Sequence, residues 1–154
     1  MLLSRPRLEV SIATQILSLW DGSRLVKSWP CSTSKFGIGF EEGSMKTPLG
    51  HFRIAEKRGD GASLHTIFKA REPVGEWHAG EAESEDLILG RILWLEGGEE
   101  RNANTLGRYV YIHGTNGEDK IGQRASHGCI RLRNQDVVEL YDLAKVGMPV
   151  WVNE

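Results

Sequence analysis

Short runs in which apolar and polar residues alternate dominate this chain and restrict it to a fold built mainly from strands. Residues 8–12 and 24–32 both show the period of two that is typical of half-buried strands. Residues 15–20 form another short apolar run, and Asp21 and Gly22 after it are a hairpin turn signal. The first third of the chain is therefore predicted to be a meander of antiparallel strands.

The rest of the chain repeats this pattern with longer interruptions. Further strands are expected at residues 51–57, 64–70, 87–95, 109–113, 130–132 and 148–152. The glycine-rich segment 33–50 and the polar segment 71–86 lose the period and are predicted to be loops. The second loop ends in an acidic run, which is more typical of a solvated loop than of a binding site: Glu81, Glu83, Glu85 and Asp86. Long loops of this kind can also form lids or substrate walls.

One stretch near the end has the period of a helix instead. Apolar residues recur at helical spacing from Val137 to Ala144, with Asn134 as the expected N-cap and Gly147 as the expected end. The predicted fold class is thus mainly β with one or two helices. The length is that of one ordinary domain, so a single domain spanning residues 1–154 is expected.

Composition excludes several classes of protein. The formal net charge of −2 is not that of a nucleic-acid binder, which usually carries a basic excess. No apolar run approaches the roughly 20 residues that cross a bilayer, and residues 1–7 lack the apolar core of a secretory signal. The sequence as given indicates a cytoplasmic protein, whereas a leader missing from it would indicate the periplasm or cell envelope. The oligomeric state is left open.

The chemistry of the chain centres on Cys129 and on His113, which precedes it by 16 positions. A thiol becomes a good nucleophile when a nearby base takes its proton or lowers its pKa, and histidine is the usual partner. Gly128 lets the backbone approach a substrate closely, so that amides around Cys129 could face a developing oxyanion. These residues predict a cysteine–histidine site for acyl transfer, with Cys129 partly ionised near neutral pH.

Other interpretations of the same residue types have less support. A lone buried cysteine is usually an inert apolar residue, and this role is assigned to Cys31. A metal site made of His113, His127 and Cys129 lacks any Cys-x-x-Cys or His-x-x-x-His spacing. Papain-like enzymes place the cysteine well over a hundred residues before the histidine, and the reverse order here disfavours that fold.

Two blocks of the sequence resemble the L,D-transpeptidase catalytic domain family (YkuD type). The resemblance rests on His113, on Ser126, His127, Gly128 and Cys129 followed by Ile130 and Arg131, and on residues 46–52. It runs from about Leu8 to Val152. Many members of the family carry Asn where this chain has Arg131.

This resemblance implies a fold, a substrate and a reaction. The fold would be a YkuD-like β-sandwich with a helix following the catalytic cysteine. The Cys129 thiolate would attack the donor tetrapeptide stem of peptidoglycan, release D-alanine and pass the acyl group to an acceptor amine, giving a 3–3 cross-link. Peptidoglycan stem peptides would be the partners, no metal or organic cofactor would take part, and carbapenems would acylate Cys129.

The resemblance also assigns roles to individual residues. Cys129 and His113 would be catalytic, with the Gly114 carbonyl holding the His113 ring in the required tautomer. The site-shaping and substrate-binding residues would be Ser126, His127, Gly128 and Gly114 for the oxyanion site, and Arg131 and Tyr111 for the substrate. A guanidinium suits bidentate contact with a carboxylate. A structural ion pair is an equally supported role for Arg131.

Two alternatives to a transpeptidase remain open. In an L,D-carboxypeptidase water would replace the acceptor amine, and an inactive peptidoglycan-binding module would lack turnover altogether. Retention of both His113 and Cys129 disfavours the inactive module. The surrounding segment has a basic excess that predicts a positive pocket for a carboxylate-rich substrate: Arg108, Lys120, Arg124, Arg131 and Arg133 against Glu118 and Asp119.

Overall fold

The structure is a computed structural model that describes residues 2–80 and 86–154. Its strands are β1 (Pro6–Ser11), β2 (Ile16–Asp21), β3 (Arg24–Ser32), β4 (Gly50–Arg58), β5 (Thr66–Lys69), β6 (Glu72–Glu76), β7 (Ile88–Gly97), β8 (Tyr111–Gly114), β9 (Ile130–Leu132) and β10 (Pro149–Asn153). The helices are α1 (Asn134–Leu143) and three short 3-10 helices, η1 (Glu100–Asn102), η2 (Leu106–Arg108) and η3 (Glu118–Lys120). The prediction of a mainly β fold with a helix after Cys129 is confirmed.

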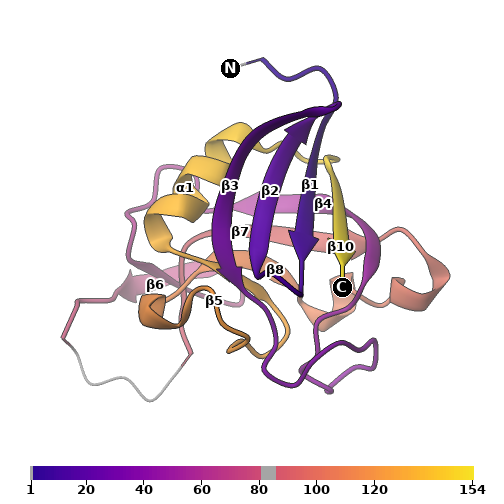
Figure 1. The fold of residues 1–154 in the computed structure, drawn as a ribbon. Helices are drawn as coiled ribbons and strands as arrows, with labels where there is room; N and C mark the ends of the chain where they lie inside the picture. Colours follow the sequence, from indigo (N-terminus) through magenta and orange to yellow (C-terminus); the bar gives the residue numbers. More distant parts are fainter. Residues whose placement is uncertain (1, 81–85) are drawn as a thin grey trace.

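All of these strands belong to one continuous sheet in the order β4-β10-β1-β2-β3-β9-β8-β7-β5-β6. Because β4 also pairs with β7, the sheet folds back and closes on itself. The pairs β1–β10 and β8–β9 are parallel, and the other neighbours are antiparallel. In Figure 1, β1, β2, β3 and β10 form one layer, and β4 and β7 run across behind it. Two layers of the same sheet therefore face one another.

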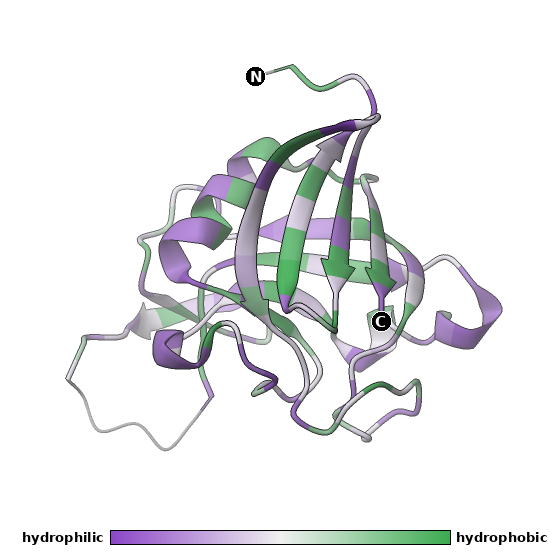
Figure 2. Ribbon diagram, in the orientation of Figure 1, coloured by the Kyte–Doolittle hydropathy of each residue, from purple (hydrophilic) through white to green (hydrophobic). Residues whose placement is uncertain are grey.

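The core fills the space between these layers and the helix. Apolar side chains alternate along the strands, as the banded colouring in Figure 2 shows, so one side of each strand faces the interior. Fully buried residues such as Leu8, Leu17, Ile54 and Ile112 come from both layers. Helix α1 packs against β7 and β8 through its own apolar side, which includes Leu140. The strand that carries His113 is thus covered by the helix that follows Cys129.

The sequence-based boundaries hold for most strands, whereas the following predictions are wrong. The segment 71–86, expected to be a loop, contains β6, whose side chains are all exposed. Tyr109 is not part of a strand, because its φ of 57° places it in the left-handed region and β8 begins only at Tyr111. Helix α1 ends at Leu143, before Gly147. Glu81, Glu83 and Glu85 lie outside the described residues.

The start of α1 also differs from the prediction. Arg133 is the N-cap, and Asn134 is the first helical residue. The backbone N–H of Asn134 donates to the Glu118 carboxylate at 2.7 Å, so an acidic side chain from η3 caps the helix. The Asn134 side chain, 1% exposed, points instead to Thr115, which follows β8. Within residues 2–80 and 86–154, no helix combines the length and the apolar character needed to cross a membrane.

Candidate active site

His113 and Cys129 come from the two short central strands. Strands β8 and β9 are parallel, with Ile112 opposite Ile130 and His113 opposite Arg131. Cys129 immediately precedes β9, so the register places it level with Tyr111. Residues 111 and 113 point to the same side of β8, because side chains in a strand alternate. The fold therefore brings the predicted thiol and imidazole to one side of the sheet.

The His113 ring is held in one orientation. Its side chain is 2% exposed, and Nδ1 lies 2.5 Å from the Gly114 carbonyl oxygen, the contact expected from the resemblance. A carbonyl can only accept, so Nδ1 carries the proton and Nε2 is left as the acceptor. Burial lowers the pKa of His113 from its ordinary value of 6.5, against the raising effect of the Gly114 carbonyl. The ring is a neutral base near pH 7.

The Cys129 thiol is protonated in this structure. It donates to the Tyr109 carbonyl oxygen at 3.5 Å and accepts from the Tyr111 backbone N–H at 3.3 Å. Burial raises its pKa to about 11, although the Tyr111 N–H and the charges of Arg131 and Arg108 act to lower it. The expectation of a partly ionised thiol near neutral pH is therefore wrong for this conformation. Among the hydrogen bonds of the described residues, none joins the thiol to the His113 ring.

A set of hydrogen bonds shapes the loop before Cys129. Ser126 Oγ donates to the Cys129 carbonyl at 2.6 Å and accepts from the Gly128 N–H at 3.3 Å. Thr47 Oγ1, from the segment before β4, donates to the Gly128 carbonyl at 3.1 Å. Gly128 has a φ of 118°, and a Cβ there would lie 3.3 Å from the Lys46 carbonyl. The two blocks that carry the family resemblance thus meet at this turn.

A second support lies behind His113. The Asn134 amide accepts from the Thr115 N–H at 2.7 Å and donates to the Thr115 carbonyl at 3.0 Å. A Cβ at Gly114 would lie 2.3 Å from Asn134 Oδ1 and 2.6 Å from the Leu89 carbonyl. Gly114 is therefore required to be glycine by this close packing. Asn134 was missed from the sequence as a site residue because an N-cap role explained it equally well.

Arg131 lies beside the site in an ion pair. Its side chain donates to the Asp86 carboxylate, and Asp86 also lies 3.2 Å from His127 Nδ1. Arg131 is 5% exposed, and its Nε has no hydrogen-bond partner within residues 2–80 and 86–154. This contact supports the structural role for Arg131. Binding of a substrate carboxylate by Arg131 stays a prediction and requires Asp86 to be displaced.

Replacement of Arg131 by asparagine is expected to lower the melting temperature. The variant loses a charge-assisted hydrogen bond and buried packing, while the partly exposed Asp86 can regain water. The free energy of unfolding is expected to fall by roughly 1–3 kcal/mol. For a chain of this size, each kcal/mol lowers the melting temperature by about 2–4 °C. Thermal melting measures it, and exposed Arg124→Asn, outside the helices and strands, is the matched control. An unchanged melting temperature with a raised KM would instead favour substrate binding by Arg131.

Tyr111 is placed differently from its predicted role. Its side chain is buried, and its hydroxyl accepts a hydrogen bond from Arg71 at 3.1 Å. The Arg71 guanidinium also lies 4.8 Å from the centre of the Trp94 ring and 5.0 Å from that of Tyr109. The contact of Tyr111 with the site is through its backbone N–H to Cys129. A direct substrate contact by the Tyr111 side chain stays a prediction.

A cavity of about 310 Å³ opens beside Cys129. It is lined by residues of the glycine-rich loop, of η2 and of the turn before β9: Glu42, Gly43, Met45, Gly107, Arg108, Tyr109, Val110, His127, Gly128 and Cys129. Of the five basic residues in the predicted positive pocket, Arg108 alone lines this cavity in the described part of the chain. Arg131 is buried in its ion pair, and Lys120, Arg124 and Arg133 are exposed. The predicted positive pocket is thus reduced to one guanidinium.

The described residues contain no group of three or more His, Cys, Asp or Glu side chains arranged to hold a metal ion. Cys31, the second cysteine, is fully buried in the core, and burial raises its pKa to about 12. The prediction that Cys31 is a packing residue is confirmed. Cys129 is then the cysteine that lines the cavity, and its role as the nucleophile stays a prediction.

Comparison with known sequences places this geometry in a family. The model of the L,D-transpeptidase catalytic domain (YkuD) matches residues 5–152. A Bacillus subtilis protein named YkuD, an L,D-transpeptidase by its name, is 30% identical over 145 residues, which are 94% of this chain and 63% of that protein. Escherichia coli YbiS, also named as an L,D-transpeptidase, is 51% identical over 45 residues, 29% of this chain and 15% of that protein. The chain spans less than two thirds of the length of these relatives.

Solved structures agree in fold. An L,D-transpeptidase from Mycobacterium smegmatis superposes with a TM-score of 0.62 at 19% identity, over 97% of this chain and 59% of that chain. L,D-transpeptidase 3 from Mycobacterium tuberculosis, solved with a faropenem-derived adduct, gives a TM-score of 0.60 at 18% identity, over 97% of this chain and 61% of that chain. These values confirm the predicted YkuD-like fold.

Proposed function

The chain belongs to the L,D-transpeptidase catalytic domain family, and we propose from this that it is a cysteine-dependent L,D-transpeptidase acting on peptidoglycan stem peptides. One observation carries the proposal beyond family membership. The Nδ1 atom of His113 is committed to the Gly114 carbonyl, which leaves Nε2 as a base on the same side of the sheet as the Cys129 thiol. Cys129 in turn lines a cavity beside the glycine-rich loop, where a peptide could bind.

The reaction begins from a neutral pair. A thiol with a pKa of about 11 and an unprotonated imidazole exchange their proton only as the sulfur attacks a carbonyl carbon. Rotation of the Cys129 side chain away from the Tyr109 carbonyl would bring the thiol to His113, since catalytic hydrogen bonds are often formed only with substrate bound. Burial of the pair favours such a coupled transfer, because neither ion is stable alone in an apolar site.

The bonds formed and broken follow from this arrangement. Cys129 Sγ forms a bond to the carbonyl carbon between an L-centred residue and the terminal D-alanine, and the thiol proton moves to His113 Nε2. Backbone amides near Gly128 and Cys129 stabilise the oxyanion, and one such donor is typically worth roughly 2.7–4 kcal/mol. The carbon–nitrogen bond then breaks, the proton passes from His113 to the leaving amine, and a thioester remains on Cys129.

The second half of the reaction decides between transfer and hydrolysis. An amine of a second stem attacks the thioester in a transpeptidase, whereas water attacks it in a carboxypeptidase. The glycine-rich loop contributes Glu42, Gly43 and Met45 to the cavity wall. A wall of this kind favours a bulky acceptor over free hydrolysis, so transfer to an amine is proposed as the main activity.

Incubation with purified disaccharide-tetrapeptides is expected to give a dimer in which the third residues of two stems are cross-linked; the family resemblance implies that this residue is usually diaminopimelate. Mass spectrometry of the products measures this, and Cys129→Ala is the control for background hydrolysis. Tripeptide product alone, even at high acceptor concentration, would show a carboxypeptidase. Unchanged substrate with the native chain would leave the inactive binding module as the function.

A further inference from the structure

Arg108 is a charged residue of the cavity that the mechanism above does not use. It ends η2, directly before Tyr109, and lines the same cavity as Cys129. The two side chains also act on each other electrostatically, since the guanidinium lowers the pKa of the thiol and the thiolate raises that of Arg108. A fixed positive charge therefore lies close to the atom that attacks the substrate.

Hydrogen bonds hold the Arg108 guanidinium in place but do not use all of its N–H donors. It donates to the Lys46 carbonyl at 2.7 Å and, more weakly, to the Gly39 carbonyl and to Ser44 Oγ at 3.4 Å each. A guanidinium has five N–H donors, so these three bonds leave donors for a ligand. Partial burial lowers the pKa of Arg108, because the charged form has lost part of its hydration. In the described part of the chain, no salt bridge joins Arg108 to a carboxylate.

The proposed substrate carries a carboxylate next to the bond that is cleaved. The leaving D-alanine holds its nitrogen in the amide that Cys129 attacks, and its carboxylate is attached to the next carbon atom. An anion of the substrate must therefore lie next to the reacting carbonyl. Two further guanidinium groups near the site are already engaged, that of Arg131 with Asp86 and that of Arg71 with the Tyr111 hydroxyl. Among the described residues that line the cavity, Arg108 is then the cation that can receive this carboxylate.

We infer that Arg108 binds the terminal carboxylate of the leaving D-amino acid and so restricts cleavage to the last residue of the stem. This assignment rests on the proposed function and adds a specificity-determining residue to it. Exposed Glu42 lines the same cavity and acts electrostatically on Arg108. The negative charge of Glu42 repels a substrate carboxylate. The selectivity is therefore assigned to bidentate hydrogen bonds from the Arg108 guanidinium and not to the net charge of the cavity.

Two tetrapeptide stems that differ only at the terminus test this role. One ends in D-alanine and the other in D-alanine amide, which has nearly the same shape and no charge. The native chain is expected to release D-alanine with a kcat/KM about 10- to 100-fold higher than D-alanine amide, the factor typical of a hydrogen bond to a charged group. Arg108→Met is expected to lose this preference by slowing only the acid substrate, and Arg108→Lys to keep part of it.

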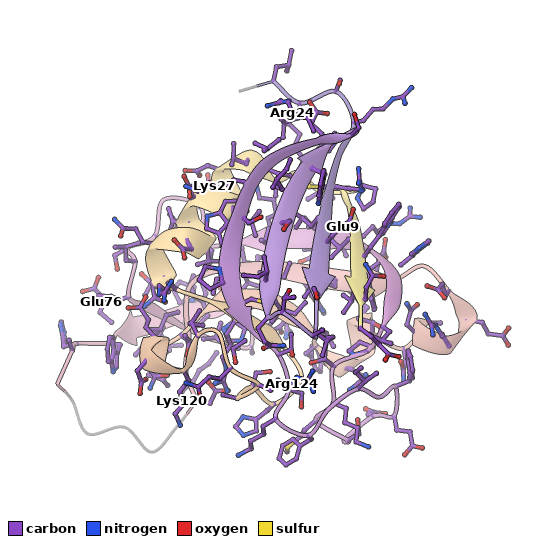
Figure 3. The ribbon with its side chains drawn as sticks, viewed as in Figure 1. Glu9, Arg24, Lys27, Glu76, Lys120 and Arg124 are labelled. Atoms are coloured by element: carbon purple, nitrogen blue, oxygen red, sulfur yellow. The ribbon has the colours of Figure 1, made fainter. Side chains whose placement is uncertain are left out.

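The controls separate this role from support of the loop. Arg124→Met removes a cation of the loop before Ser126, labelled in Figure 3, that does not line the cavity, and should leave the preference unchanged. If Arg108 only holds residues 39–46, Arg108→Met will slow both substrates equally, which would overturn the inference. Equal rates for the two substrates with the native chain would also overturn it, whatever the variants do. Release of neither product by the native chain would mean that the proposed function itself is wrong.

Discussion

Carbapenem treatment is expected to add the mass of one drug molecule to the chain, and Cys129→Ala is expected to remove this adduct completely. If Cys129 is the nucleophile, as proposed, its thiol should also attack a β-lactam carbonyl, and the opened ring should stay on sulfur as a thioester. Intact mass spectrometry reads the result directly.

The second cysteine supplies the matched control for this experiment. Cys31 is fully buried and its pKa is about 12, so it cannot compete for the drug in the folded protein. Cys31→Ala is therefore expected to be acylated like the native chain. An adduct of equal yield on Cys129→Ala would exclude Cys129 as the nucleophile.

Features that depend on local sequence could be predicted without a structure. The hairpin at Asp21 and Gly22 and the strands around it follow from alternation and turn residues, which act over a few positions. The pairing of His113 with Cys129 in one site followed from the family blocks, and the parallel register of β8 and β9 supplies its physical basis. Burial of Cys31 was also predictable, since an isolated thiol in an apolar run is usually packed.

Features that depend on distant contacts could not be predicted. Asp86 pairs with Arg131, which lies 45 positions further along the chain. The acidic run in the sequence does not indicate which of its carboxylates forms an ion pair with a buried residue. The pKa of Cys129 is set by burial, which the flanking glycine does not reveal. Strand β6 has only exposed side chains, so it lacks the apolar alternation by which strands are recognised and forms by pairing with β5.

Replacement of His113 by glutamine is expected to lower kcat by about 10²- to 10⁴-fold, the usual contribution of a general base. Glutamine keeps a side-chain hydrogen-bonding group in the buried site but cannot take the thiol proton. Steady-state release of D-alanine measures the loss, and circular dichroism checks that the variant is folded. Exposed His51, which stacks on Trp151, gives the control variant His51→Gln, expected to retain native activity.

The pH profile separates a lost base from a disturbed site. In the native chain the imidazole must be neutral, and burial lowers its pKa below 6.5, so activity should fall only at acid pH below that value. In His113→Gln no base takes the thiol proton, and the reaction must wait for spontaneous ionisation of a thiol whose pKa is about 11. Activity of the variant should therefore rise steadily through the alkaline range, where the native profile is flat. If the variant is slow but its activity still falls at the same acid pH as that of the native chain, another group is the base. His113 would then have only a packing role in the interior.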